Sequence, residues 1–179
     1  MKLFVKILVA VMLLFVPAAG SQAFQNEPNG FRDMYWGESL QEIQQSRECE
    51  YGYYDKTSNS VFYYIELKNN EDHTMSGIPI LGNRVKAQLW NNQLTSICIS
   101  FGSPQKIEIE DAYKNLLNSA SINFGTPSIS SNGPKTWWGE TSYILIFKNN
   151  EDFPYTISVI IGSTKLFKMA LQDGASQGW

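Results

Sequence analysis

Two stretches rich in aromatic and β-branched residues, each preceded by a helical pattern, constrain the fold of this chain most. In the first stretch, residues 85–90 and 94–101 alternate between apolar and polar side chains on either side of a short polar turn, Asn91-Asn92-Gln93. This pattern predicts a β-hairpin. Aromatic residues crowd two earlier segments, 51–55 and 61–67, which we also expect to be strands.

A second group of strands is expected near the C-terminus. Residues 136–147 and 155–161 carry β-branched and aromatic side chains and are separated by polar residues. They have the composition of strands that pack one face or both faces against a core.

A helix is expected before the first group of strands. Ser39 is followed three residues later by Glu42, which is the spacing of a capping box. Leu40 and Ile43 supply an apolar face, so the spacing predicts a short helix from Ser39 to about Arg47.

A longer helix is expected before the second group. Apolar side chains recur every three or four positions over residues 113–124, and Gly125 and Pro127 follow as helix terminators. The tail from Ser163 fits a helix that stops at Gly174 or an edge strand; we favour the helix.

The order helix, strands, helix, strands predicts an α+β fold. We expect an antiparallel sheet with two helices, or three with the tail, packed on one face. The segment Lys68-Asn69-Asn70-Glu71-Asp72 recurs unchanged at 148–152, and Trp36-Gly37-Glu38-Ser39 is matched at 138–141. A polar turn used twice explains the recurrence. The alternative is a duplicated helix-plus-strands unit, with halves at 31–101 and 108–179.

The first 23 residues have the pattern of a secretory signal peptide. Two lysines precede an unbroken apolar run over residues 7–16, and small residues lead to an expected cleavage after Ala23. The run is shorter than the about 20 residues that a membrane-spanning helix needs. We therefore expect residues 24–179 to form a single α+β domain, soluble, acidic, and secreted or periplasmic, with no membrane span. An uncleaved amphipathic anchor is the alternative.

Two cysteines remain in the expected mature chain, Cys49 and Cys98. In an oxidising compartment they permit one disulfide, which we expect to form. Two buried free thiols are the alternative, because the apolar setting Ile97-Cys98-Ile99 suits either state.

Composition excludes two classes of protein. An aromatic content of 13% is far too high for a chain that stays disordered. A formal charge of -3 argues against a nucleic-acid binder, because phosphate recognition depends on a clustered excess of Lys and Arg.

Two segments resemble known small exported proteins. Residues 31–43, which contain Trp36-Gly37-Glu38-Ser39 and Glu42, resemble the WG-x-S-x-x-E opening of many small secreted bacterial proteins of unassigned role. The helix at 113–124, its Gly125-Thr126-Pro127 exit and Trp137 resemble what often follows in such chains. The same order is similar to the helix-plus-sheet units of the beta-lactamase inhibitory protein and of small outer-membrane assembly lipoproteins.

The resemblance implies a non-catalytic extracytoplasmic module and transfers no functional residue. The chain departs from the pattern in two respects. Its first helix has no G-x-P exit, running instead into Glu48-Cys49-Glu50, and no cysteine near residue 23 could accept a lipid.

Few residues suggest catalysis, and we expect no catalytic, cofactor or metal site. His73 is the single histidine and lies in a polar segment, so a solvated side chain is expected there rather than a triad member or metal ligand. A small secreted hydrolase would need two carboxylates held across a cleft. Five glutamates are available for this alternative: Glu66, Glu108, Glu110, Glu140 and Glu151.

Aromatic residues are the remaining functional signal. Because alternate residues of a strand face opposite sides of a sheet, the adjacent pair Trp137-Trp138 cannot point inward together. Tyr and Trp anchor many binding faces because they offer large contact areas with few rotatable bonds. We therefore expect a binding module that presents aromatic side chains to a protein, a peptide or an envelope glycan, with acidic rims that select a basic or neutral partner. The expected anchors are Trp36, Tyr63, Trp137 and Trp138, and a homodimer through an edge strand is an open alternative.

Overall fold

The protein is described here from a computed structural model that covers residues 24–128, 133–149 and 154–176. The expected signal peptide, residues 1–23, and most of the second copy of the repeated polar segment lie outside the described residues.

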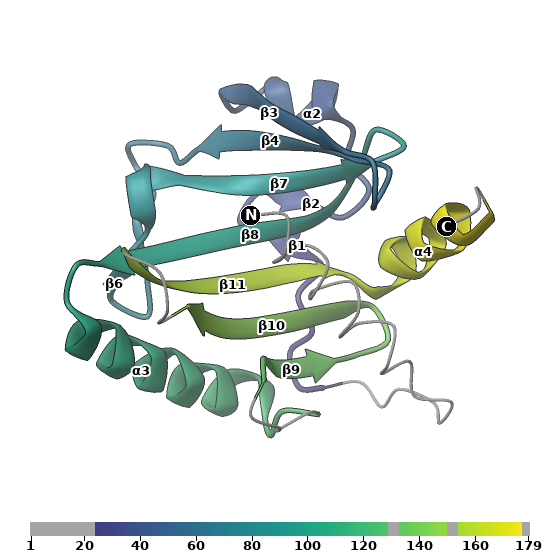
Figure 1. Ribbon diagram of the computed structural model, residues 1–179. Coiled ribbons are helices and arrows are strands. Elements are labelled where there is room, and N and C mark those ends of the chain that lie inside the picture. The colour runs from purple at the N-terminus through teal and green to yellow at the C-terminus, as the bar shows by residue number, and fades with distance from the viewer. Residues whose placement is uncertain (1–23, 129–132, 150–153, 177–179) are drawn as a thin grey trace.

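Seven antiparallel strands form one continuous sheet. Figure 1 shows it from β3 at the top to β9 at the bottom. In spatial order the strands are β3 (Cys49–Asp55), β4 (Ser60–Glu66), β7 (Arg84–Trp90), β8 (Gln93–Ser103), β11 (Tyr155–Ser163), β10 (Ser142–Asn149) and β9 (Lys135–Trp138). With its helices, this sheet gives the α+β fold that the sequence predicts.

The sheet consists of two antiparallel meanders that meet through their last strands. The first runs β3-β4-β7-β8 and the second runs β9-β10-β11, and β8 pairs with β11 from Ser96↔Gly162 to Ser103↔Tyr155. Each meander follows a helix in the chain. The first copy of the repeated segment begins at Lys68, two residues after β4 ends, and the second begins at Lys148, within the last two residues of β10.

Within the described ranges, three helices accompany the sheet: α2 (Leu40–Gln44), α3 (Lys106–Phe124) and α4 (Thr164–Ser176). The expected capping box is present, because Ser39 Oγ accepts from the Glu42 amide while the Glu42 carboxylate accepts from the Ser39 amide. Helix α2 ends before Arg47, whose side chain turns inward. Helix α4 confirms the helical reading of the tail but continues past Gly174.

Two helices lie on one face of the sheet and the third lies on the other. Apolar side chains of α2 and α3 belong to the same main core as Ile144 of β10. In α4, by contrast, Phe167 packs on Tyr143, the neighbouring residue of β10, at 5.4 Å between ring centroids. Because adjacent strand residues face opposite sides, α4 covers the outer face and not the face of α2 and α3.

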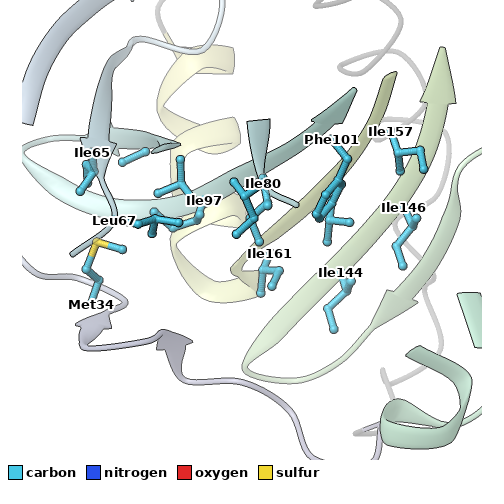
Figure 2. Close-up of a cluster of buried hydrophobic side chains, with 14 of the residues drawn as sticks. Met34, Ile65, Leu67, Ile80, Ile97, Phe101, Ile144, Ile146, Ile157 and Ile161 are labelled. Carbon is cyan, nitrogen blue, oxygen red and sulfur yellow. The ribbon is translucent and has the colours of Figure 1, made fainter. Parts of the chain in front are cut away.

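The main core fills the inner face. Figure 2 shows side chains from β4, β8, β10 and β11 gathered in one layer with Met34. Its largest fully buried members include Trp137, Phe101, Ile65, Ile97 and Ile144.

Short elements that the sequence analysis did not predict fill the connections. A two-stranded pairing, β1 (Gly30–Phe31) with β2 (Met34–Tyr35), precedes α2, and β5 (Thr74–Met75) pairs with β6 (Ile78–Pro79) between β4 and β7. A single turn, η1 (Leu81–Asn83), leads into β7. Two-residue strands carry too little periodicity to be recognised in a sequence.

The expected disulfide between Cys49 and Cys98 is not present, and both cysteines are free. Two strands, β4 and β7, separate β3 from β8. Three strand spacings amount to roughly 14 Å, far beyond the reach of a disulfide. The residues also face opposite sides, since Cys49 is paired with Ile65 of the core face and Cys98 with Lys86 of the outer face.

Candidate functional site: the aromatic edge

Strand β3 forms one edge of the sheet. Among the described residues, β4 is the only strand paired with it. The Glu66 amide donates to the Glu48 carbonyl at 3.2 Å, which makes these two residues a hydrogen-bonded pair. Because such pairs alternate along an antiparallel ladder, the backbone groups of Cys49 and Tyr51 point away from β4. They offer hydrogen bonds to an added strand.

A β-bulge at Gly52 decides where the tyrosines of β3 point. Tyr51 pairs with Tyr63, but the next pair is Tyr53 with Phe62, so one residue of β3 has no counterpart on β4. The extra residue places Tyr53 on the outer face. A Cβ at residue 52 would lie 2.9 Å from the Phe62 carbonyl oxygen, so only glycine fits here without a shift.

Tyrosine rings are left uncovered on the inner side of this edge. Tyr51 is 60% exposed and Tyr54 is 48% exposed. Helix α3 packs over β8, β10 and β11, and Figure 1 shows the short helix α2 rather than α3 beside β3. The Tyr51 ring meets the ring of Tyr63 edge-on at 5.9 Å, and the Tyr54 hydroxyl donates to Asn59.

The outer side of the edge is aromatic and cationic. Tyr53 stacks on Phe62 with a centroid distance of 4.7 Å and an interplanar angle of 17°. The Lys86 ammonium lies 5.4 Å from the Phe62 ring centroid, and the Arg84 guanidinium lies 4.5 Å from that of Tyr64. Cation–π contacts of this kind keep the rings and cations in place. We call the six rings the aromatic edge: Tyr51, Tyr53, Tyr54, Phe62, Tyr63 and Tyr64.

The charges around the edge are mixed. Glu48 and Glu50 are exposed near this edge, and Glu50 lies opposite Tyr64 on the outer face, which Arg84 and Lys86 also occupy. Arg84 pairs with Glu50 at 3.5 Å. The acidic rim that the sequence predicts is therefore interrupted by two cations here.

The four predicted anchors have different surroundings. Tyr63 belongs to the aromatic edge and is half-buried. Trp36 is half-buried near the start of α2, with its indole N–H donating to the Pro28 carbonyl at 3.1 Å. Trp138 is half-buried on the outer face, stacked on Tyr143 at 5.3 Å and contacted by Phe167 of α4.

The prediction that Trp137 is a binding anchor is wrong. Its side chain is fully buried among the core residues of the inner face, and its indole N–H donates to the Gly125 carbonyl at 2.8 Å. It therefore presents no surface to a partner. Tyr51 and Tyr54 are the more exposed rings, and their crowding in the sequence was the signal that could have identified them.

The carboxylates that come together in this structure surround a buried arginine. The Arg47 side chain is fully buried, and it donates to Asp33 through Nε at 2.8 Å and to Glu71 through Nη2 at 2.5 Å. Burial raises the pKa of Asp33, but hydrogen bonds from Lys68 and Arg47 outweigh that effect and lower it to about 2. The Arg47 hydrogen bond likewise lowers the pKa of Glu71. This cluster fixes the connection between the β1–β2 pairing, α2 and the first polar repeat.

His73 is half-buried, and its Nε2 lies 3.0 Å from the Lys68 carbonyl oxygen. In the part of the chain that the structure describes, no group of three or more His, Cys, Asp or Glu side chains is arranged to hold a metal ion. Within the same residues, no helix combines the length and apolar character needed to cross a membrane.

Comparison with protein-family models, curated proteins and solved structures finds no match for this chain.

Proposed function

We propose that this protein is a non-catalytic, extracytoplasmic binding module that holds an extended segment of a protein partner against β3. The proposal rests on one observation: the edge strand β3, with one side unpaired among the described residues, carries two half-exposed tyrosines, Tyr51 and Tyr54. Strand addition supplies affinity through backbone hydrogen bonds, and flanking side chains supply selectivity.

The tyrosines suit this role in energetic terms. Each ring offers a large apolar area, and burying such area on binding contributes roughly 25 cal/mol per Å². The rings are held by contacts inside the protein, Tyr51 by Tyr63 and Tyr54 by Asn59. Little side-chain freedom therefore remains to be lost when a partner covers them.

Export is part of the proposal. The leader expected at residues 1–23 supports it, and the mature chain would then meet partners of the cell envelope or the exterior. Recognition at β3 would favour an extended segment that carries both acidic and basic side chains, since Glu50 and Arg84 flank the edge.

The test compares capture by three forms of the chain from an envelope extract. The wild type should retain a defined partner, and a Tyr51→Ser/Tyr54→Ser variant should capture about ten-fold less of that partner. The matched control is Ile107→Ser/Ile122→Ser, because these side chains are 68% and 77% exposed but lie on α3. Equal capture by both double variants, with folding checked by circular dichroism, would refute a role for the edge.

A further inference from the structure

The outer face of the aromatic edge is acidic where β3 begins. Glu48 and Glu50 are exposed there, and Glu66, whose amide donates to the Glu48 carbonyl, is exposed on β4. The Arg84 guanidinium lies beside them, 3.5 Å from the Glu50 carboxylate, and Arg84 is the residue of β7 opposite Glu66. Three carboxylates around one guanidinium give this end of the edge a negative charge.

The same face is cationic farther along β3. The Lys86 ammonium lies 6.0 Å from the Tyr53 ring centroid and 5.4 Å from that of Phe62, so its charge sits over the rings of the edge although Lys86 belongs to β7. Within the ranges that the structure describes, no carboxylate lies at ion-pair distance from Lys86. The Asp55 carboxylate accepts from two backbone amides of the turn that follows β3.

The bulge at Gly52 fixes the spacing between these two places. Glu50 and Tyr53 lie opposite Tyr64 and Phe62 of β4, which are only two positions apart. Because its side chains alternate between faces, a regular strand added on the free side reaches both places with residues that are also two positions apart. The residue opposite Glu50 would form a non-hydrogen-bonded pair, in which side chains lie closest.

The direction of an added strand follows from the rest of the sheet. Every pairing in the seven-stranded sheet is antiparallel, and antiparallel pairing is slightly the more stable kind. In an antiparallel partner, the residue opposite Tyr53 precedes the residue opposite Glu50. Charge complementarity therefore requires an acidic residue first, near Lys86, and a basic residue two positions later. The residue between them faces the exposed Tyr51 ring on the inner side, which favours an apolar side chain.

A second copy of β3 does not meet this requirement. The strand carries Glu50 and Asp55 and has no basic residue in Cys49–Asp55. Antiparallel pairing of two copies around Glu50 would place the two Glu50 carboxylates directly opposite each other, and like charges in that position are destabilising.

We propose that β3 binds a strand of a different protein that carries, from its N-terminus to its C-terminus, an acidic, an apolar and a basic residue. The segment pairs antiparallel to β3, with the basic side chain at Glu50 and the acidic side chain at Lys86. This inference rests on the proposed function of β3 as a docking edge and adds the chemistry and the direction of the partner.

The test compares two peptides of identical composition with blocked ends, Thr-Val-Glu-Val-Lys-Val-Thr and Thr-Val-Lys-Val-Glu-Val-Thr. Fluorescence anisotropy of the labelled peptides measures their binding to the full chain. We expect the peptide with the acidic residue first to bind at least about five-fold more tightly, because exchanging the charges replaces attraction by repulsion at two places. In 1 M NaCl the two affinities should converge, because the charged groups are exposed to solvent.

Two substitutions assign the preference to these charges. Glu50→Gln and Lys86→Gln should each reduce it to about two-fold, because one of the two charge pairs is lost. Lys86→Met, which keeps an apolar stem against the rings, replaces Lys86→Gln if that variant does not fold. The matched control, Asp111→Asn/Lys114→Gln, removes an exposed ion pair on α3 and should leave the preference unchanged. Tyr51→Ser/Tyr54→Ser should weaken both peptides equally, because their inner sides are identical.

The outcomes separate this inference from the proposed function. Equal affinities, or tighter binding of the peptide with the basic residue first, overturn the charge order, whereas the docking edge stands if Tyr51→Ser/Tyr54→Ser weakens both. A preference that survives both Glu50→Gln and Lys86→Gln also overturns it. Absence of binding by either peptide overturns the inference, and capture from the envelope extract then decides the proposed function alone. A wild-type dimer in light scattering that Tyr51→Ser/Tyr54→Ser abolishes would show that a second copy occupies β3.

Discussion

Arg47 and Asp33 join two segments that are separated by 14 residues, through a guanidinium that is fully buried and a carboxylate that is half-exposed. Breaking a buried ion pair from one side leaves the other charge without compensation. Arg47→Met should therefore lower the free energy of unfolding by about 2 kcal/mol, a value reduced for the exposure of Asp33. Urea unfolding measures the change. Lys114→Met, in a pair exposed on both sides, is the control and should have almost no effect.

The same cluster predicts a pH dependence of stability. The folded pKa of Asp33, about 2, is below its ordinary value of 3.8. A depressed carboxyl pKa stabilises the folded state above the unfolded value, and this contribution is lost as the pH falls through the folded value. Stability should decline between about pH 4 and pH 2, and Glu71 and Glu27, whose pKa values are also lowered, should add to the decline.

Unfolding at a series of pH values checks this expectation. Asp33→Asn should make the decline below about pH 4 shallower, because one of the titrating groups is gone. Asp111→Asn changes an exposed carboxylate and should preserve the wild-type shape. A wild-type curve that stays level down to pH 2 would contradict the prediction.

Gly52 should be intolerant of a side chain. Gly52→Ala places a Cβ 2.9 Å from the Phe62 carbonyl oxygen and should destabilise the bulge by about 1–3 kcal/mol. Gly102→Ala is the matched control, because its nearest neighbour, Leu81, lies at an ordinary 3.6 Å. Thermal unfolding of the two variants makes the comparison. Equal melting temperatures would show that the bulge does not require glycine.

The two cysteines should stay reduced within each chain under oxidising conditions. Thiol titration of the denatured protein should recover both Cys49 and Cys98. Cys49→Ser should not lower stability by the about 2–5 kcal/mol that follows removal of a native disulfide. Detection of a peptide linked through the two cysteines of one chain would disprove this arrangement.

Export should remove the first 23 residues. N-terminal sequencing of the chain secreted by a bacterial host should start at Phe24. Leu13→Arg interrupts the apolar run and should leave uncleaved chain inside the cell, whereas Leu13→Ile should be processed normally. A secreted chain that retains Met1 would contradict the assignment.

Local sequence patterns predict most of the larger elements. The Ser39–Glu42 capping box marks the start of α2, and Gly125, with φ of 81°, ends α3 where expected. Asn91 and Asn92 both have positive φ values in the β7–β8 turn, as a tight hairpin requires. These features involve neighbouring residues, so their physics is readable in a short window of sequence.

Contacts between distant segments are not readable in this way. The end of α2 depends on Arg47 reaching Asp33 and Glu71, and the state of Cys49 depends on the spatial order of the strands. The alternation rule predicts that Trp137 and Trp138 diverge, but only the packing of α4 on the outer face shows which of them is buried. The hydrogen bond that the Glu27 carboxylate accepts from the Glu140 amide spans 113 residues and leaves no local pattern.

The pairing of β8 with β11 determines when the sheet can be completed. The strands of the first meander pair with one another in chain order as far as β8. The other side of β8 pairs with β11, a strand that begins only at Tyr155. Ordering the long intervening chain before these contacts form slows folding. A nascent or truncated chain without β11 would expose an apolar edge that invites aggregation. Nearly the whole chain must therefore be synthesised before the seven-stranded sheet can form.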